Sequence, residues 1–131
     1  MKFWGYRRPD GRVGTRNHVL ILATVGCAAE TARLAADGLY GAVSFINQNG
    51  CGESSRNLRR TRDVLLGLAA HPNVYGVVAI GLFTPAQIEG LAAVSPNVVF
   101  LNSSPDETRF DSVVPNYALG IRLAVDYLLE L

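Results

Sequence analysis

The chain has 131 residues, of which 49% are hydrophobic and 18% charged, and its formal net charge is +1. This length supports one hydrophobic core rather than two substantial lobes, and the composition excludes a disordered chain. The scattered arginines and the near-neutral charge argue against nucleic-acid binding. No apolar run approaches the roughly 20 residues of a membrane span, and the first eight residues lack the long apolar core of a signal peptide, so we expect a cytoplasmic protein.

Apolar runs alternate with helical patterns along most of the chain. Residues 1–17 are polar, with a tight-turn signal at 9–11, and predict an irregular or hairpin lead-in. The expected strands span 18–24, 42–47, 74–81, 97–102 and 111–114, and the expected helices span 28–37, 55–70, 85–93 and 116–131. This alternation indicates a parallel sheet with right-handed crossovers.

The stretch 74–81 organises this prediction, because it is almost continuously apolar, β-branched at four of eight positions and closed by glycine. It is typical of a central strand buried on both faces. We therefore predict a single three-layer α/β domain, a flavodoxin-like or Rossmann-like doubly wound parallel sheet of five strands in the order 2-1-3-4-5.

The two long helices that follow the second and last strands carry apolar faces. In the helix 55–70, the residues expected to share the inner face are Leu58, Val64, Leu65, Leu68 and Ala69. The closing helix 116–131 is expected to pack back on the sheet. If its apolar face stays uncovered, we expect a homodimer instead of a monomer.

Ligands of doubly wound sheets bind outside the carboxyl ends of the strands. The best candidate there is the loop 49–54, because its glycines allow close backbone approach and the N–H groups at the next helix start favour a small anion. The predicted ligand-binding residues are Thr24, Gly26, Cys27, Asn49, Gly50, Cys51, Gly52, Ser54 and Asn102. The alternative is a tight turn that needs glycine only for its geometry.

Cys27 and Cys51 are expected at helix N-termini on this edge, where the helix dipole lowers the pKa of a thiol. They are weak candidates for metal ligands or reactive thiols, because a zinc site needs three or four protein ligands. Small buried or half-buried turn cysteines are the simpler interpretation. His18 and His71 belong to the opposite edge, and a strand of about 20 Å separates His18 from Cys27.

Four carboxylates near the carboxyl edge could take part in acid–base chemistry. They are Glu30, Glu53, Asp106 and Glu107. Each is interpreted more simply as a solvated loop or first-turn residue. Cys51 and Glu53 remain the weak catalytic candidates.

From Gly5 to about Val78 the sequence resembles the central domain of the altronate/galactarate dehydratase family, bacterial enzymes that remove water from sugar acids. The matching stretches are 5–17, Thr24-Val-Gly-Cys27, Asn49-Gly-Cys-Gly52 and 71–78. The resemblance implies a hydro-lyase that uses divalent iron or manganese. Arg12, Arg16 and Asn17 match the family and could contact a carboxylate. They precede the first strand, so only a lead-in that folds back would bring them to the carboxyl edge. After Gly81 the family's expected thiol and carboxylate are replaced by Leu-Phe-Thr-Pro.

From Gly76 to Leu131 the sequence is similar to the sugar-binding core of galactose/lactose-type repressors, which have a periplasmic-binding-protein fold. The matching stretches are 76–81, 84–88, 97–106, 110–114 and 119–131. In that family Asn102 stands where an aspartate is common.

The two resemblances meet within 74–81, and neither covers the whole chain. We therefore predict a recombined or engineered α/β scaffold chimera without an intact active site and without a cofactor. It is expected to bind a small anion or sugar acid at most weakly, at the carboxyl edge of the sheet. One alternative is a fragment of a sugar-acid dehydratase that needs further domains. Another is a half-lobe of a sugar-sensing repressor core.

Overall fold

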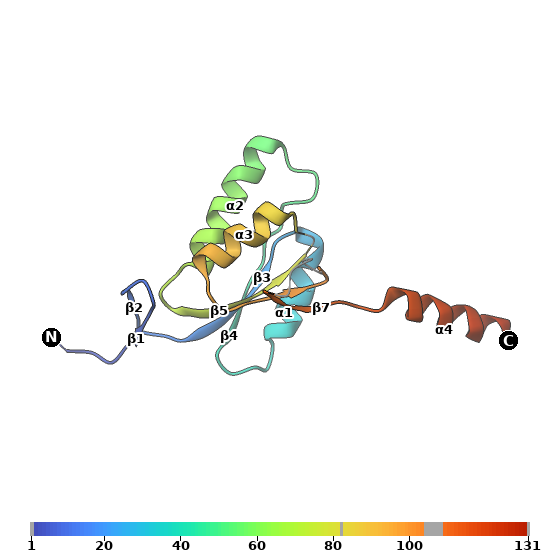
Figure 1. Ribbon diagram of the computed structural model, residues 1–131, viewed down its shortest axis with the longest axis horizontal. Coiled ribbons are helices and arrows are strands. Elements are labelled where there is room, and N and C mark those ends of the chain that lie inside the picture. Colours follow the sequence, from blue (N-terminus) through green and yellow to red (C-terminus); the bar gives the residue numbers. More distant parts are fainter. Residues whose placement is uncertain (1, 82, 104–108, 131) are drawn as a thin grey trace.

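A computed structural model of the chain describes residues 2–81, 83–103 and 109–130. Its body is a twisted sheet with helices on both faces, preceded by a small hairpin and followed by a helix that projects away (Figure 1). None of the helices among the described residues is long and apolar enough to cross a membrane.

Five parallel strands form the central sheet in the order β4-β3-β5-β6-β7. Their bounds are β3 His18–Ala23, β4 Ala42–Phe45, β5 Val74–Ile80, β6 Val98–Leu101 and β7 Asp111–Val113. Counted within this sheet alone, the order is 2-1-3-4-5, because the hairpin takes the first two labels. The predicted doubly wound α/β fold class is confirmed.

The predicted lead-in is a hairpin of β1 (Tyr6–Arg7) and β2 (Val13–Gly14), which pair antiparallel. The guanidinium of Arg8 donates to the carbonyl of Pro72 at 2.7 Å and to the side-chain oxygen of Asn17 at 2.8 Å. These bonds hold the hairpin at the amino edge of the sheet.

The sheet is covered by three helices and one short turn of 3-10 helix. These are η1 Gly26–Ala28, α1 Ala29–Ala36, α2 Ser55–Ala69 and α3 Pro85–Val94. α1 covers one face, and α2 and α3 cover the other (Figure 1). Thr84 and Gln87 form a capping box at the start of α3, and Pro85 is its first residue.

Strand alternation divides the core into two clusters. Leu22, Val77 and Phe100 face α2 and α3, and the Phe100 ring meets those of Phe83 and Phe110 edge to face at 5.1 and 5.6 Å. Ile21 and Ile80 face α1. β5 therefore contributes to both clusters, as expected of a central strand.

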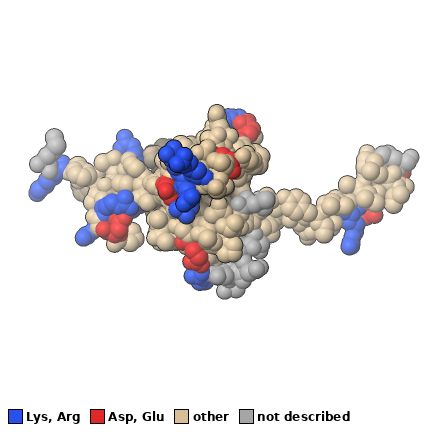
Figure 2. Space-filling view, turned by 90° about the horizontal axis from the view of Figure 1, so that it is seen from above, with Lys and Arg blue, Asp and Glu red and all other residues tan. Residues whose placement is uncertain are grey.

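The prediction of which α2 residues face the core is partly wrong. Leu65 and Ala69 are buried and Leu68 packs against them, but Leu58 and Val64 are 42% and 56% exposed. The first turns of α2 extend beyond the sheet, so they have no strand beneath them (Figure 1). Exposed arginines at 56, 59, 60 and 62 give α2 the basic patch in Figure 2.

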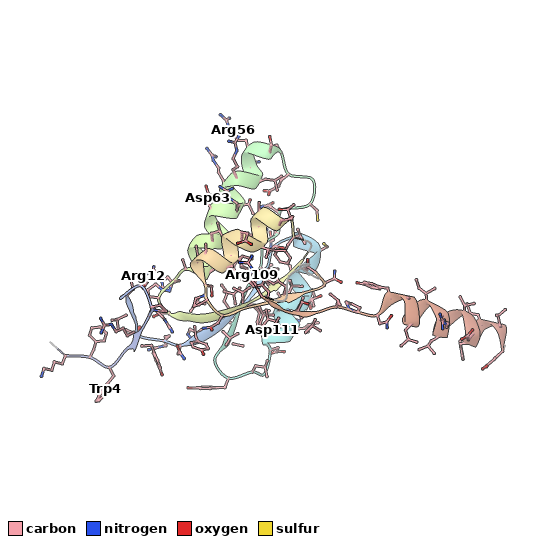
Figure 3. All side chains as sticks on the ribbon, viewed as in Figure 1. Trp4, Arg12, Arg56, Asp63, Arg109 and Asp111 are labelled. Atoms are coloured by element: carbon pink, nitrogen blue, oxygen red, sulfur yellow. The ribbon has the colours of Figure 1, made fainter. Side chains whose placement is uncertain are left out.

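The closing helix α4 (Tyr117–Leu129) contradicts the prediction that it packs back on the sheet. None of its described residues is buried, and Ile121 and Leu128 are 66% and 67% exposed. Figures 1 and 3 show it extending away from β7. The linker 114–116 leads outward, and the apolar face of α4 is left uncovered by the residues that the structure describes.

Candidate functional site

The candidate site is formed by the two turns that follow β3 and β4. These strands are neighbours and pair in parallel, with Leu22 opposite Phe45, so their carboxyl ends lie together. The backbone N–H of Gly26 donates to the carbonyl of Asn49 at 2.8 Å and joins the turns directly. The structure thus brings together six predicted site residues, Thr24, Gly26, Cys27, Asn49, Gly50 and Cys51.

A buried amide, Asn47, clamps the two turns. Its Nδ2 donates to the carbonyl of Thr24 at 2.9 Å, and its Oδ1 accepts from the N–H of Asn49 at 3.1 Å. Asn47 is only 6% exposed, so its own amide is largely shielded from water. The predicted site residues omit Asn47, although a polar residue closing an apolar strand is a signal that could have identified it.

The loop that follows Asn47 requires glycine at position 50. Gly50 has φ of +106°, and a Cβ there would lie 3.0 Å from the carbonyl of Thr24. Within the described parts of the chain, the N–H groups of Gly50, Cys51 and Gly52 donate to no protein acceptor. Three such donors just before α2 are suited to bind an anion.

The Thr24 hydroxyl is engaged inside the protein rather than open to a ligand. It donates to the carbonyl of Ile80 at 3.1 Å, on the central strand β5. Thr24 therefore contributes to the site through its position and its backbone carbonyl.

The two thiols meet at this edge, with 3.8 Å between the sulfur of Cys27 and that of Cys51. Both side chains are exposed, so the expectation of buried or half-buried cysteines is wrong. The hydrogen bond with Cys27, followed by the charge of that thiol, raises the pKa of Cys51, which is opposite to the lowering expected from the helix dipole. Cys51 lies three residues before Ser54, which occupies the N-cap position of α2, and its direct neighbour is the thiol of Cys27.

Iron or manganese does not fit the residues described. Across 2–81, 83–103 and 109–130, no group of three or more His, Cys, Asp and Glu side chains could hold a metal ion. The two thiolates alone are an incomplete ligand set.

Pockets lie on both sides of the joined turns. One, of about 250 Å³, lies towards α2 and α3 and is lined by Gly50, Thr61 and Gln87 among others. A second, of about 600 Å³, lies on the α1 side and is lined by both cysteines and Asn102. The loop 50–51 contributes to both pockets.

The candidate carboxylates are held in different ways. Glu53 is half-buried and accepts from the Thr61 hydroxyl at 3.0 Å, which ties it to α2. Glu30 is exposed, and its bond from Arg33 at 2.7 Å lowers its pKa. Asp106 and Glu107 lie outside the described residues. Among the candidate carboxylates that the structure describes, Glu53 is therefore the one next to the glycine loop.

Ser54 and Asn102 flank the joined turns. Ser54 is exposed and occupies the N-cap position of α2 in an extended conformation, without a capping hydrogen bond from its side chain. Asn102, at the end of β6, has φ of +62°, and its Oδ1 accepts from the Tyr117 hydroxyl at 2.6 Å. Asn102 thus shares the larger pocket with the thiols while being held by the first residue of α4.

The remaining polar candidates lie at the opposite edge. Arg12 donates to the carbonyl of Ala70 at 2.6 Å and pairs with Asp10 at 2.7 Å. His71 accepts from the N–H of Asn73 at 3.1 Å. Arg16, Asn17 and His18 belong to this same amino edge, so the hairpin does not fold back to the candidate site.

Comparison with protein families gives a match over residues 5–111 to the model described as "D-galactarate dehydratase/Altronate hydrolase, second domain". This match extends past 74–81, further than the resemblance ending near Val78. It includes the joined turns and four of the five sheet strands completely.

Individual relatives share shorter stretches. The (2R)-sulfolactate sulfo-lyase subunit beta of Chromohalobacter salexigens is 31% identical over 99 residues, covering 73% of this chain and 25% of that protein. The altronate dehydratase of Escherichia coli is 37% identical over 87 residues, covering 59% and 18%. The chain therefore spans a quarter or less of the curated relatives it matches.

A second group of relatives consists of transcriptional regulators. The HTH-type regulator GanR of Bacillus subtilis is 38% identical over 55 residues, covering 42% of this chain and 17% of that protein. A LacI family regulator from Lactobacillus casei, solved with bound sucrose, covers 87% of this chain and 42% of that chain at 19% identity and a TM-score of 0.49. Both predicted family resemblances are confirmed.

Proposed function

Because the chain belongs to the D-galactarate dehydratase/altronate hydrolase family through its second domain, we propose that it binds the substrate carboxylate of a sugar-acid hydro-lyase. The observation that carries this proposal is the pair of turns clamped by Asn47 at the carboxyl edge of the sheet. Next to that clamp, the N–H groups of residues 50–52 have no acceptor among the described residues and are suited to a carboxylate.

The names of the relatives favour one substrate class. Altronate is a sugar acid, and sulfolactate is a hydroxy acid that also carries a sulfonate. Dehydratase and sulfo-lyase both denote eliminations, and the carboxylate is common to the two substrates. We therefore expect a hydroxycarboxylate, with its carboxylate at 50–52 and its hydroxyls towards Thr61 and Gln87 in the smaller pocket.

Catalysis needs more than the described residues provide. Elimination requires a base for the proton beside the carboxylate and an acid for the leaving hydroxyl. Glu53 and Cys51 are the candidates, but Glu53 is tied to Thr61 and Cys51 is in contact with Cys27. Since the chain spans a quarter or less of its relatives, we propose that turnover depends on further domains.

Amide NMR tests the binding proposal directly. Galactarate should shift the amide signals of Gly50, Cys51 and Gly52, with a Kd of about millimolar because an open edge supplies few contacts. The neutral polyol galactitol is the matched control and should leave them unchanged. Equal shifts with galactitol, or galactarate shifts confined to Arg12 and Arg16, would contradict the proposal.

Activity measurements test the role of the missing domains. The chain alone should not dehydrate altronate or galactarate, even with added iron or manganese. Mixing it with the remaining domains of a family member should produce activity that Cys51→Ala removes. Turnover by the isolated chain would refute the dependence on further domains.

A second proposal is that the chain is a recombined scaffold joined within 74–81. The two groups of relatives and the uncovered helix α4 support it, because a helix moved from another protein would leave its original packing surface behind. Such a scaffold should be stable without turnover and should not respond to neutral sugars. Thermal stabilisation by a neutral sugar would favour a sugar-sensor half-lobe instead.

A further inference from the structure

Cys27 and Cys51 are the two cysteines of the chain, and the fold brings their sulfurs to 3.8 Å. They come from separate turns, 24 residues apart in sequence. The parallel pairing of β3 with β4 and the bond from Gly26 to Asn49 place these turns side by side. The approach of the two thiols is therefore a consequence of the sheet register.

The pair can close into a covalent bond with a small movement. A disulfide has a sulfur–sulfur distance of about 2.05 Å, so the sulfurs must approach by less than about 2 Å. Gly50 and Gly52 flank Cys51 with φ of +106° and +79°, and a Cβ at Gly52 would meet nothing within 4 Å. Both thiols are exposed, so a small oxidant can reach them.

We propose that Cys27 and Cys51 form a reversible intramolecular disulfide through exchange with a low-molecular-weight disulfide such as oxidised glutathione. This site does not depend on sugar-acid binding. The disulfide would make the carboxyl edge respond to the thiol–disulfide balance of its surroundings. Transient disulfides that act as redox sensors in reducing compartments work in this way.

The exchange takes place in two steps. The Cys27 thiolate attacks a sulfur of glutathione disulfide, a glutathione thiolate leaves, and a mixed disulfide remains on Cys27. Cys51 then loses its proton and attacks the Cys27 sulfur, which releases the second glutathione. The two protein thiols lose two protons and two electrons in total, and one glutathione disulfide becomes two glutathiones.

The order of attack follows from the contact between the thiols. The hydrogen bond with Cys27, followed by the charge of that thiol, raises the pKa of Cys51 and so lowers its thiolate fraction, which is why we assign the first attack to Cys27. Once Cys27 carries glutathione, it no longer has the thiol that raises the pKa of Cys51, and Cys51 then acts as the second nucleophile.

The bridge would also change the neighbouring binding surface. Both cysteines line the pocket of about 600 Å³ on the α1 side. Drawing Cys51 towards Cys27 would fix the loop 50–52, whose glycines otherwise allow it to adjust. The oxidised chain should therefore present a more rigid edge.

Equilibration with a glutathione redox buffer, followed by acid quenching and mass spectrometry, tests this proposal. The wild-type chain should lose two hydrogens and both free thiols, and dithiothreitol should restore them. At about 0.1 mM glutathione, an effective thiol concentration of about 1 mM or more should favour the bridge over the mixed disulfide by roughly tenfold. The thermal midpoint should rise by roughly 5–10 °C on oxidation.

Two kinds of variant serve as controls. Cys27→Ser and Cys51→Ser should each stop at one bound glutathione. The double variant Cys51→Ser/Thr15→Cys keeps two exposed thiols but places them at opposite edges of the sheet, so it should accept two glutathiones and form no bridge. Two glutathiones on the wild-type chain, or disulfide-linked dimers in place of the internal bridge, would overturn the proposal.

Discussion

Thr24 is bonded twice to Ile80, because both its backbone N–H and its hydroxyl donate to that carbonyl at 3.1 Å. The end of β3 is thereby fixed to the end of the central strand β5. The next residue, Gly81, has φ of +152°, and a Cβ there would overlap the Thr24 hydroxyl. The position needs glycine for both space and conformation.

We expect Gly81→Ala to lower the free energy of unfolding by about 1–3 kcal/mol, since it overpacks this contact. Urea denaturation followed by circular dichroism measures the loss. Gly120→Ala is the matched control, because it lies in α4 with nothing within 4 Å and should be neutral or stabilising by up to about 1 kcal/mol. Adding Thr24→Ala to Gly81→Ala should recover part of the loss, and full additivity would contradict the overlap.

The buried amide of Asn47 gives a second prediction. Asn47→Ala removes the bonds to Thr24 and Asn49 and leaves a buried carbonyl without its donor, so we expect a loss of about 1–3 kcal/mol. Chemical denaturation measures it. Asn49→Ala, at an exposed position, is the control and should change stability by no more than about 0.5 kcal/mol. Similar losses in both variants would contradict the clamp.

The raised pKa of Cys51 predicts how fast it is alkylated. Cys27→Ala removes the hydrogen bond and charge that raise this pKa, so more thiolate should be present at pH 8 and iodoacetamide should react faster. Thr31→Ala, in the same pocket, keeps both thiols and should preserve the wild-type rate at Cys51. In the wild-type chain the protonated contact favours the folded state below about pH 9 and is lost as the pH rises through the folded pKa. Slower alkylation after Cys27→Ala would contradict this relationship.

The pKa of Glu30 is lowered, so its effect on stability depends on pH in the opposite direction to that of Cys51. Its hydrogen bond and charge contact with Arg33 favour the folded state above the ordinary pKa of 4.5 and are lost as the pH falls through the folded value. Arg33→Ala should raise the Glu30 pKa, as measured by carboxyl NMR titration, and Arg122→Ala should not. About 1 M salt should reduce the wild-type shift, because it shortens the Debye length to about 3 Å. A shift insensitive to both changes would contradict the pairing.

The exposure of α4 predicts that it contributes little to stability and promotes association. Removing residues 117–131 should change the thermal midpoint by no more than a few degrees, because none of the described residues of α4 is buried. The full chain should self-associate as its concentration rises, and the truncated chain should stay monomeric, as measured by size-exclusion chromatography with light scattering. Leu128→Glu should weaken association and Arg122→Glu should not. A monomeric full chain at high concentration would contradict the prediction.

The sequence predicted the sheet closely because its strands are short apolar runs, and the topology follows from their alternation with helices. The bounds of β5, expected at 74–81 and found at Val74–Ile80, illustrate this. The position of the glycine loop also follows, because parallel strands end at one edge. The position of each strand can be predicted from its own residues, and the position of the loop follows from the parallel direction of the strands.

Contacts between separate turns could not be predicted in the same way. The contact that raises the pKa of Cys51 depends on the relative placement of two side chains, and an argument from helix dipoles alone gives the wrong sign. The prediction of where α4 packs fails for a related reason. Apolar periodicity indicates that a helix has a face to bury, but it does not indicate which surface will cover that face. The clamp by Asn47 combines a local bond to Asn49 with a bond to Thr24, which lies 23 residues earlier in the chain.

The central sheet ends on one side at β7, which has three residues and begins with Asp111. A fibril grows when an open strand offers a long, flat row of backbone donors and acceptors to the next molecule. Three residues with a carboxylate at one end make a poor template for that growth. The chain is therefore protected against edge-to-edge amyloid assembly on this side, even where its side chains promote association.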